Sequence, residues 1–179
     1  MTEYPTRTEG LLLERDVNRS LRSLAHDIPP LVLAAILPML AELDDAKDLN
    51  RRAISVPVHR ILATAWRADR LARCERLLAE GQKPPPVHLV RYKLAGENWY
   101  TVSDGHHRTV AARNAGRKRI RAVVGCETPI HPDRYVLRDG RLWRKTVHES
   151  YGACLERVPV DITPEVAQAL QSVGVEEKP

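Results

Sequence analysis

The run Asp-Gly-His-His-Arg at residues 104–108 constrains the fold more than any other part of this chain. An aromatic and β-branched stretch precedes it, which predicts a strand that ends at a turn. Beyond Gly105, apolar residues recur at helical spacing as far as Gly116, which predicts a helix and its C-terminal stop. We therefore expect a strand, a tight glycine turn and a helix start in direct succession, with Ser103 or Asp104 as the helix cap.

This succession predicts a phosphate-binding site. Free backbone N–H groups and the positive end of the helix dipole converge at such a turn, and Gly105 lets a phosphate approach the backbone closely. His106, His107 and Arg108 lie on the first helical turn, where the arginine can clamp two oxygens at once. The alternatives are that Gly105 is a plain turn glycine and that one of the two histidines packs in the core.

The run resembles the motif of the ParB/sulfiredoxin superfamily, whose members carry Gly-x-x-Arg between a strand and a helix and bind nucleotide phosphates with it. The Asp-Gly-His-x-Arg form is typical of ParB-like proteins of unassigned activity and of the free serine kinases of that superfamily. The resemblance covers roughly residues 54–124 and includes a Pro-Pro-Val strand start at 85–87 and a final strand at 119–124.

The resemblance implies a nucleotide (ATP, ADP or CTP) whose phosphates contact Gly105, His106, His107 and Arg108. It places Asp104 against Mg²⁺ or the hydroxyl of a phosphate acceptor, which would make Asp104 both the metal ligand and the catalytic carboxylate. The implied reactions are phosphoryl transfer and nucleotide hydrolysis, which need little beyond positioning and charge stabilisation. The alternative for Asp104 is a helix N-cap.

The chain also departs from its apparent relatives. His106 stands where sulfiredoxin has its catalytic cysteine, so sulfinic-acid reductase activity is not expected. The serine kinases use a glutamate between the first strand and the next helix, and only Asp69 can replace it here. The same segment carries Arg67 and Arg70, and ParB relatives place arginine there to reach phosphates. These two arginines are expected nucleotide contacts, with plain surface charge as the alternative.

Charge supports an anionic ligand and leaves a second function open. The net charge is +5, and 21 of the 28 Lys and Arg residues lie in 51–145, with acidic excess on both sides. Arg117, Lys118, Arg119 and Arg121 form a cluster that can contact a nucleic-acid backbone. The second hypothesis is therefore a nucleic-acid-associated regulator or a nuclease-like module. An Arg-rich solvated surface, common in bacterial proteins from GC-rich genomes, is the neutral interpretation.

Site-specific DNA clamping is not supported. Chromosome-partitioning ParB proteins carry Gly-Glu-Arg-Arg at the motif, whereas this chain has histidines in the middle positions. They also carry a helix–turn–helix domain after the core, and no such pattern follows Gly125.

The elements predict an α+β fold with a small mixed sheet in the ParB/sulfiredoxin manner. We expect an N-terminal helical extension over 1–50, a core over 51–128, and a C-terminal hairpin and short helix over 129–179. In a third hypothesis, the N-terminal helices form a homodimer and the motif is a relic. The expected helices are 11–24, 31–47 (bent at Pro38), 69–80, 106–115 and one from Thr163; the expected strands are 53–61, 87–94, 99–102, 119–125, 135–138 and 141–144.

Cysteine spacing and hydropathy point to a cytoplasmic protein with no membrane partner. The three cysteines form no Cys-x-x-Cys pair and no zinc-type spacing with histidine. No basic-then-apolar signal segment opens the chain. The apolar stretch 30–40 is too short to cross a bilayer and contains Pro38.

Overall fold

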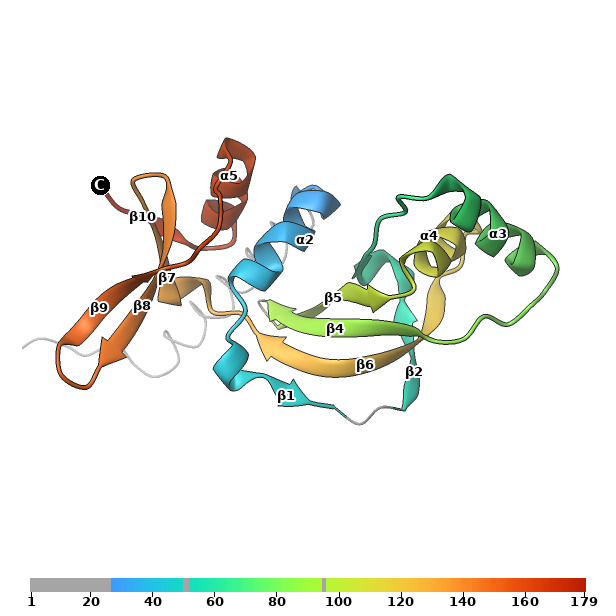
Figure 1. Ribbon diagram of the computed structural model, residues 1–179, viewed down its shortest axis with the longest axis horizontal. Coiled ribbons are helices and arrows are strands. Elements are labelled where there is room, and N and C mark those ends of the chain that lie inside the picture. Colours follow the sequence, from blue (N-terminus) through green and yellow to red (C-terminus); the bar gives the residue numbers. More distant parts are fainter. Residues whose placement is uncertain (1–26, 50–51, 95) are drawn as a thin grey trace, which may run out of the picture. The chain divides into compact units, whose positions relative to one another are not determined.

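The computed structural model describes residues 27–49, 52–94 and 96–179, which contain four α-helices and two mixed β-sheets (Figure 1). The fold is α+β, as the sequence predicts. The chain divides into two compact units: one comprises residues 41–93 and 98–130, and the other the remaining described residues. The helix expected over 11–24 lies outside the described residues.

The unit that carries the Asp-Gly-His-His-Arg run is built on a six-stranded sheet with the order β1-β6-β4-β5-β3, and β2 also pairs with β6. β4 runs parallel to β6 and β3 parallel to β5, whereas β1 and β2 are antiparallel to β6. The strands are β1 (Lys47–Asp48), β2 (Ala53–Pro57), β3 (Ile61–Leu62), β4 (Val87–Leu94), β5 (Glu97–Asp104) and β6 (Arg119–Pro129).

Two helices of this unit pack against each other, α3 (Ala68–Ala79) and α4 (His106–Asn114), and lie together in Figure 1. The core beneath them consists of the inward side chains of the sheet, among them Val87, Leu89 and Val102. Both helices end as the sequence predicts, at a glycine in the left-handed region: Gly81 (φ +76) and Gly116 (φ +67). In each case the N–H groups of the glycine and of the residue after it donate to carbonyls of the last turn.

Two predicted elements are shorter than expected. The strand expected over 53–61 ends at Pro57, whose nitrogen cannot donate to a ladder; a 3₁₀ turn over 58–60 then leads to β3 beside β5. The helix expected over 31–47 ends at Met39, one residue after Pro38. The residues that follow bond instead to the edge of β6 and its continuation, where Ala41 bridges to Ile130 and β1 pairs.

The second unit contains α2 (Pro30–Met39), α5 (Pro164–Ser172) and a four-stranded sheet with the order β10-β7-β8-β9. The predicted hairpin is confirmed as β7 (Tyr135–Arg138) and β8 (Arg141–His148), turned at two residues with positive φ. The cap of α5 is confirmed as well, because Thr163 Oγ1 accepts from the N–H of Val166 at 3.4 Å. In this unit the sequence did not predict β9 (Gly152–Arg157) and β10 (Glu176–Glu177), just as it did not predict β1 in the other unit.

The helix α2 is apolar along its length and buries Leu33, Ile36 and Leu37 while it packs against α5. Ten residues are too few for a bilayer. Among the residues that the structure describes, no helix has the length and apolar character needed to cross a membrane.

Candidate functional site

The start of α4 depends on Gly105. Its backbone adopts φ +100 and ψ 26, a left-handed conformation that side chains disfavour. A Cβ at this position would lie 2.7 Å from Cγ1 of Val87 and 2.9 Å from a terminal nitrogen of Arg108. The turn expected from the sequence is therefore present, and both its conformation and its surroundings require glycine.

The expected side-chain cap of α4 is wrong. Gly105 itself is the N-cap residue, and neither Ser103 nor Asp104 bonds to the first N–H groups of the helix. Asp104 instead accepts from a terminal nitrogen of Arg108, with 2.7 Å between the atoms. The helix thus begins without a side-chain acceptor of its own, a state in which its N–H groups and dipole favour an external anion.

Arg108 points toward the protein rather than standing free. One terminal nitrogen donates to the carbonyls of Pro85 (2.8 Å) and Pro86 (3.0 Å), and the other to Asp104. Its side chain is only 18 % exposed. The guanidinium therefore fastens α4 to the segment that enters β4, and three of its donor positions are already used.

The two histidines fasten a different segment. The buried His107 accepts through Nε2 from the N–H of Arg67 at 3.2 Å, and His106 accepts through Nδ1 from the N–H of Thr64 at 3.4 Å. Both rings also make edge contacts with Trp66; the distance between ring centroids is 5.0 Å for His106 and 4.7 Å for His107.

A cavity of about 590 Å³ opens at the start of α4; we call it the α4 cavity. Arg70 and Arg73, one helical turn apart on α3, line it, and neither forms an ion pair or side-chain hydrogen bond within the described part of the chain. Trp66, 65 % exposed, lies at the same cavity. The other lining residues are Cys74, Leu77 and the run from Ser103 to Arg108.

Of the two arginines expected to contact the nucleotide, Arg67 and Arg70, only Arg70, in the first turn of α3, lines the cavity. Arg67 is held by Asp69 through two bonds, at 3.1 and 2.8 Å. This hydrogen bonding, together with the charge of the partner, lowers the pKa of Asp69 and raises that of Arg67. The carboxylate considered as a substitute for the kinase glutamate is therefore occupied by its neighbour.

The sequence did not single out Arg73 or Trp66. Arg73 follows Arg70 by three residues in a predicted helix, so helical spacing could have placed both on one face. For Trp66 the signal was a large aromatic residue among small and polar neighbours just before a helix. Its contact with the histidines joins positions about forty residues apart, which spacing does not reveal.

The basic cluster after α4 lies away from the α4 cavity, and none of its four residues lines it. Arg119 donates to the hydroxyl of Ser55 at 2.9 Å and to its carbonyl at 2.6 Å, and so fastens β2 to β6. Arg117, Lys118 and Arg121 are exposed.

Asp104 is the carboxylate expected to hold Mg²⁺. Its side chain is 70 % exposed and one oxygen is engaged by Arg108. No group of three or more potential ligand side chains occurs among the described residues. Because Mg²⁺ commonly binds through one carboxylate, waters and substrate phosphates, Asp104 fits a cation that arrives with a phosphate, but not a site built by protein alone.

Comparison with known proteins gives limited likenesses. No family model matches the chain, and no curated protein matches it. Among the solved structures that resemble part of it are two mutants of a free serine kinase, one in complex with AMP and one with ADP. Each is 24 % identical with a TM-score of 0.35 over 45 % of this chain. The chain spans about a third of each kinase, 33 % and 34 %.

Proposed function

We propose that this protein binds a nucleotide by its phosphates in the α4 cavity. The observation that carries the proposal is the start of α4, where Gly105 is the N-cap residue and no side chain caps the helix. This helix start opens into the α4 cavity, which is also lined by two arginines with no partner in the described chain. Backbone N–H groups and a dipole end attract phosphate, and guanidinium groups bind it by charge-assisted bonds.

The roles differ from those that the motif suggests at first. Arg70 and Arg73 are the phosphate contacts, together with the N–H groups behind Gly105, whereas Arg108 holds the framework of the site. His106 and His107 hold the loop that carries Trp66. This division assigns binding to arginines whose side chains form no hydrogen bond or ion pair with the part of the chain that the structure describes.

In this proposal, Asp104, the one carboxylate of the motif, would hold a Mg²⁺ ion that is bound to the phosphates. The cation would supply charge neutralisation between the phosphates. By holding that cation, Asp104 would serve phosphoryl transfer or nucleotide hydrolysis. The ParB/sulfiredoxin resemblance of the motif agrees with this chemistry.

The test is a binding titration of ATP, ADP and CTP, each with and without Mg²⁺, against the parent and two variants. The double substitution Arg70→Ala/Arg73→Ala removes two charge-assisted contacts and should weaken binding roughly tenfold or more. Arg76→Ala is the matched control, because Arg76 lies on the same helix, is exposed and does not line the cavity. Equal affinity in the double variant and the parent would reject the site.

A second candidate function, nucleic-acid binding, is supported by the exposed basic residues Arg117, Lys118 and Arg121. These residues lie apart from the α4 cavity, so the two functions have separate determinants. Phosphate-backbone contacts of this kind weaken steeply with added salt.

A further inference from the structure

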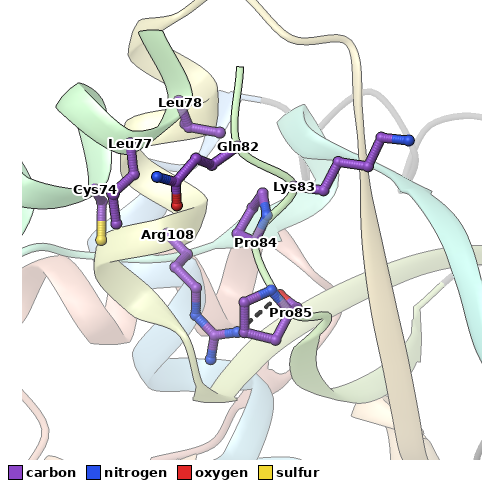
Figure 2. A pocket seen from close by; sticks show the side chains of 8 residues that line it. All are labelled: Cys74, Leu77, Leu78, Gln82, Lys83, Pro84, Pro85 and Arg108. Carbon is purple, nitrogen blue, oxygen red and sulfur yellow. Dashed lines mark hydrogen bonds between the residues drawn. The ribbon is translucent and has the colours of Figure 1, made fainter. Parts of the chain in front are cut away.

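A second, smaller cavity adjoins the first. It measures about 170 Å³ and lies between the last turns of α3 and the stretch 82–85 that leads into β4, so we call it the proline cavity (Figure 2). Cys74, Leu77 and Arg108 line both cavities. The two spaces therefore meet along one shared wall.

The walls of the proline cavity are mainly apolar. Leu77 and Leu78 stand on one side, and the rings of Pro84 and Pro85 on the other. Figure 2 shows the Gln82 amide between these two walls, while Lys83 extends away from the cavity. The nitrogen of that amide donates to Glu80 at 3.4 Å, a long bond that a better acceptor can replace.

Arg108 gives the cavity a flat, charged surface. Its guanidinium is held in place by the carbonyls of Pro85 and Pro86 and by Asp104. A guanidinium so fixed is a platform on which a planar ring can stack. The cavity thus combines apolar sides, a cationic plane and one amide able both to donate and to accept.

We infer that the proline cavity is the subsite for the planar base of the nucleotide whose phosphates occupy the α4 cavity. The inference rests on the proposed function, which supplies the phosphates. Cavities for drug-sized ligands begin at about 300 Å³; a space of about 170 Å³ therefore suits one ring system and not a whole nucleotide. Gln82 reads the polar edge of the ring, and Arg108 lies between base and phosphates.

The experiment compares ATP and CTP with tripolyphosphate, which has the phosphates but no base. Gln82→Trp fills the mouth of the proline cavity, and Gln82→Ala removes the amide with little risk to folding because the residue is exposed. Gln168→Trp makes the same large change on an exposed residue of α5, in the other compact unit, and is the matched control.

We expect Gln82→Trp to weaken the tighter-binding nucleotide at least tenfold and Gln82→Ala to weaken it severalfold. Tripolyphosphate affinity should stay within twofold of the parent in both variants and in Gln168→Trp. A preference for ATP over CTP would assign a purine, and the reverse a pyrimidine.

Two other results would overturn the inference, and they differ from each other. If the parent binds tripolyphosphate as tightly as either nucleotide, and the Gln82 variants change nothing, the base subsite is wrong while phosphate binding stands. If the parent binds neither nucleotide nor tripolyphosphate, the proposed function fails and the base subsite fails with it.

Discussion

At the residue scale, Gly105 combines two separable demands, its backbone conformation and the closeness of Val87. Gly105→Ala should lower the free energy of unfolding by about 1–2 kcal/mol for the left-handed backbone and by a further ~1–3 kcal/mol for overpacking. Gly116→Ala is the control, because Gly116 also has positive φ but a Cβ there meets open space.

Urea denaturation of both variants measures the difference. Only Gly105→Ala should also weaken nucleotide binding, since it moves the start of α4. Equal losses of stability at the two glycines would mean that Val87 moves aside at no cost, and that the close packing of the turn does not itself require glycine.

Arg108 makes a second prediction at this scale. Arg108→Lys keeps the charge but loses the planar fork that reaches Asp104 and the carbonyls of Pro85 and Pro86. The free energy of unfolding should fall by about 1–3 kcal/mol without any ligand. Arg73→Lys, at an arginine with no partner in the described chain, should stay within about 0.5 kcal/mol of the parent.

The measurement is again urea denaturation, now without nucleotide. A variant Arg108→Lys as stable as the parent but deficient in nucleotide binding would show that the side chain serves the phosphates directly. The motif arginine would then return to the role that the family resemblance implies.

These residues show where prediction from sequence ended. The turn at Gly105 and the stops at Gly81 and Gly116 were predictable, because positive φ selects glycine locally. The direction of Arg108 was not, since its acceptors are carbonyls more than twenty residues away that come close only in the folded sheet. Local spacing likewise predicted that Ser103 or Asp104 caps α4, but in the folded protein Asp104 pairs with Arg108 instead.

At the scale of elements, the same limit applies to the strands and helices. Periodicity placed α3, α4 and the β7–β8 hairpin, whose signals are local. It predicted a helix beyond Met39 and a single strand in place of β2 and β3. Periodicity contains no information on tertiary pairing, and here β1 pairs with β6 and β3 pairs with β5. The exposed strand β9 carries no apolar alternation at all.

One buried ion-pair group joins two central strands and makes the prediction at this scale. Glu127 on β6, 10 % exposed, pairs with Arg91 and Lys93 on β4. Burial acts to raise the pKa of Glu127, but the hydrogen bond from Lys93 and the charges of both partners outweigh it, so the pKa lies below its ordinary value of 4.5.

A carboxyl whose pKa is lowered by folding stabilises the protein above its unfolded pKa, and that contribution disappears as pH falls through the folded pKa. Glu127→Gln should therefore cost about 1–3 kcal/mol at pH 7, and the deficit should shrink as pH falls below 4.5. Urea denaturation from pH 7 to pH 3 follows it.

The control for this prediction is Glu156→Gln, which breaks an exposed pair with Arg144 in the other compact unit. An exposed pair contributes at most about 1 kcal/mol, so this variant should differ little from the parent at any pH. A deficit of Glu127→Gln that stays constant down to pH 3 would contradict the assignment of the lowered pKa to the strand pair.

At the scale of the whole molecule, basic charge is divided between a cavity and a surface. Arg70 and Arg73 line the α4 cavity, whereas Lys118 and Arg121 are exposed elsewhere on the same unit. Arg119 contributes bonds to Ser55 and is a poor site for a charge test. The double substitution Lys118→Ala/Arg121→Ala therefore removes surface charge with the least disturbance of the sheet.

This variant separates the two candidate functions when ATP and duplex DNA are titrated over a range of salt concentrations. If nucleotide binding resides in the cavity, its ATP affinity should stay within about twofold of the parent, well short of the tenfold that one charge-assisted contact of about 1.4 kcal/mol supplies. Any DNA binding that the surface provides should lose about two units of its log–log salt slope, roughly one for each phosphate contact removed.

Loss of ATP affinity in this variant, with no change in Arg70→Ala/Arg73→Ala, would move the anion site from the cavity to the surface. Arg70 and Arg73 would then be solvated charge, and the start of α4 a structural turn.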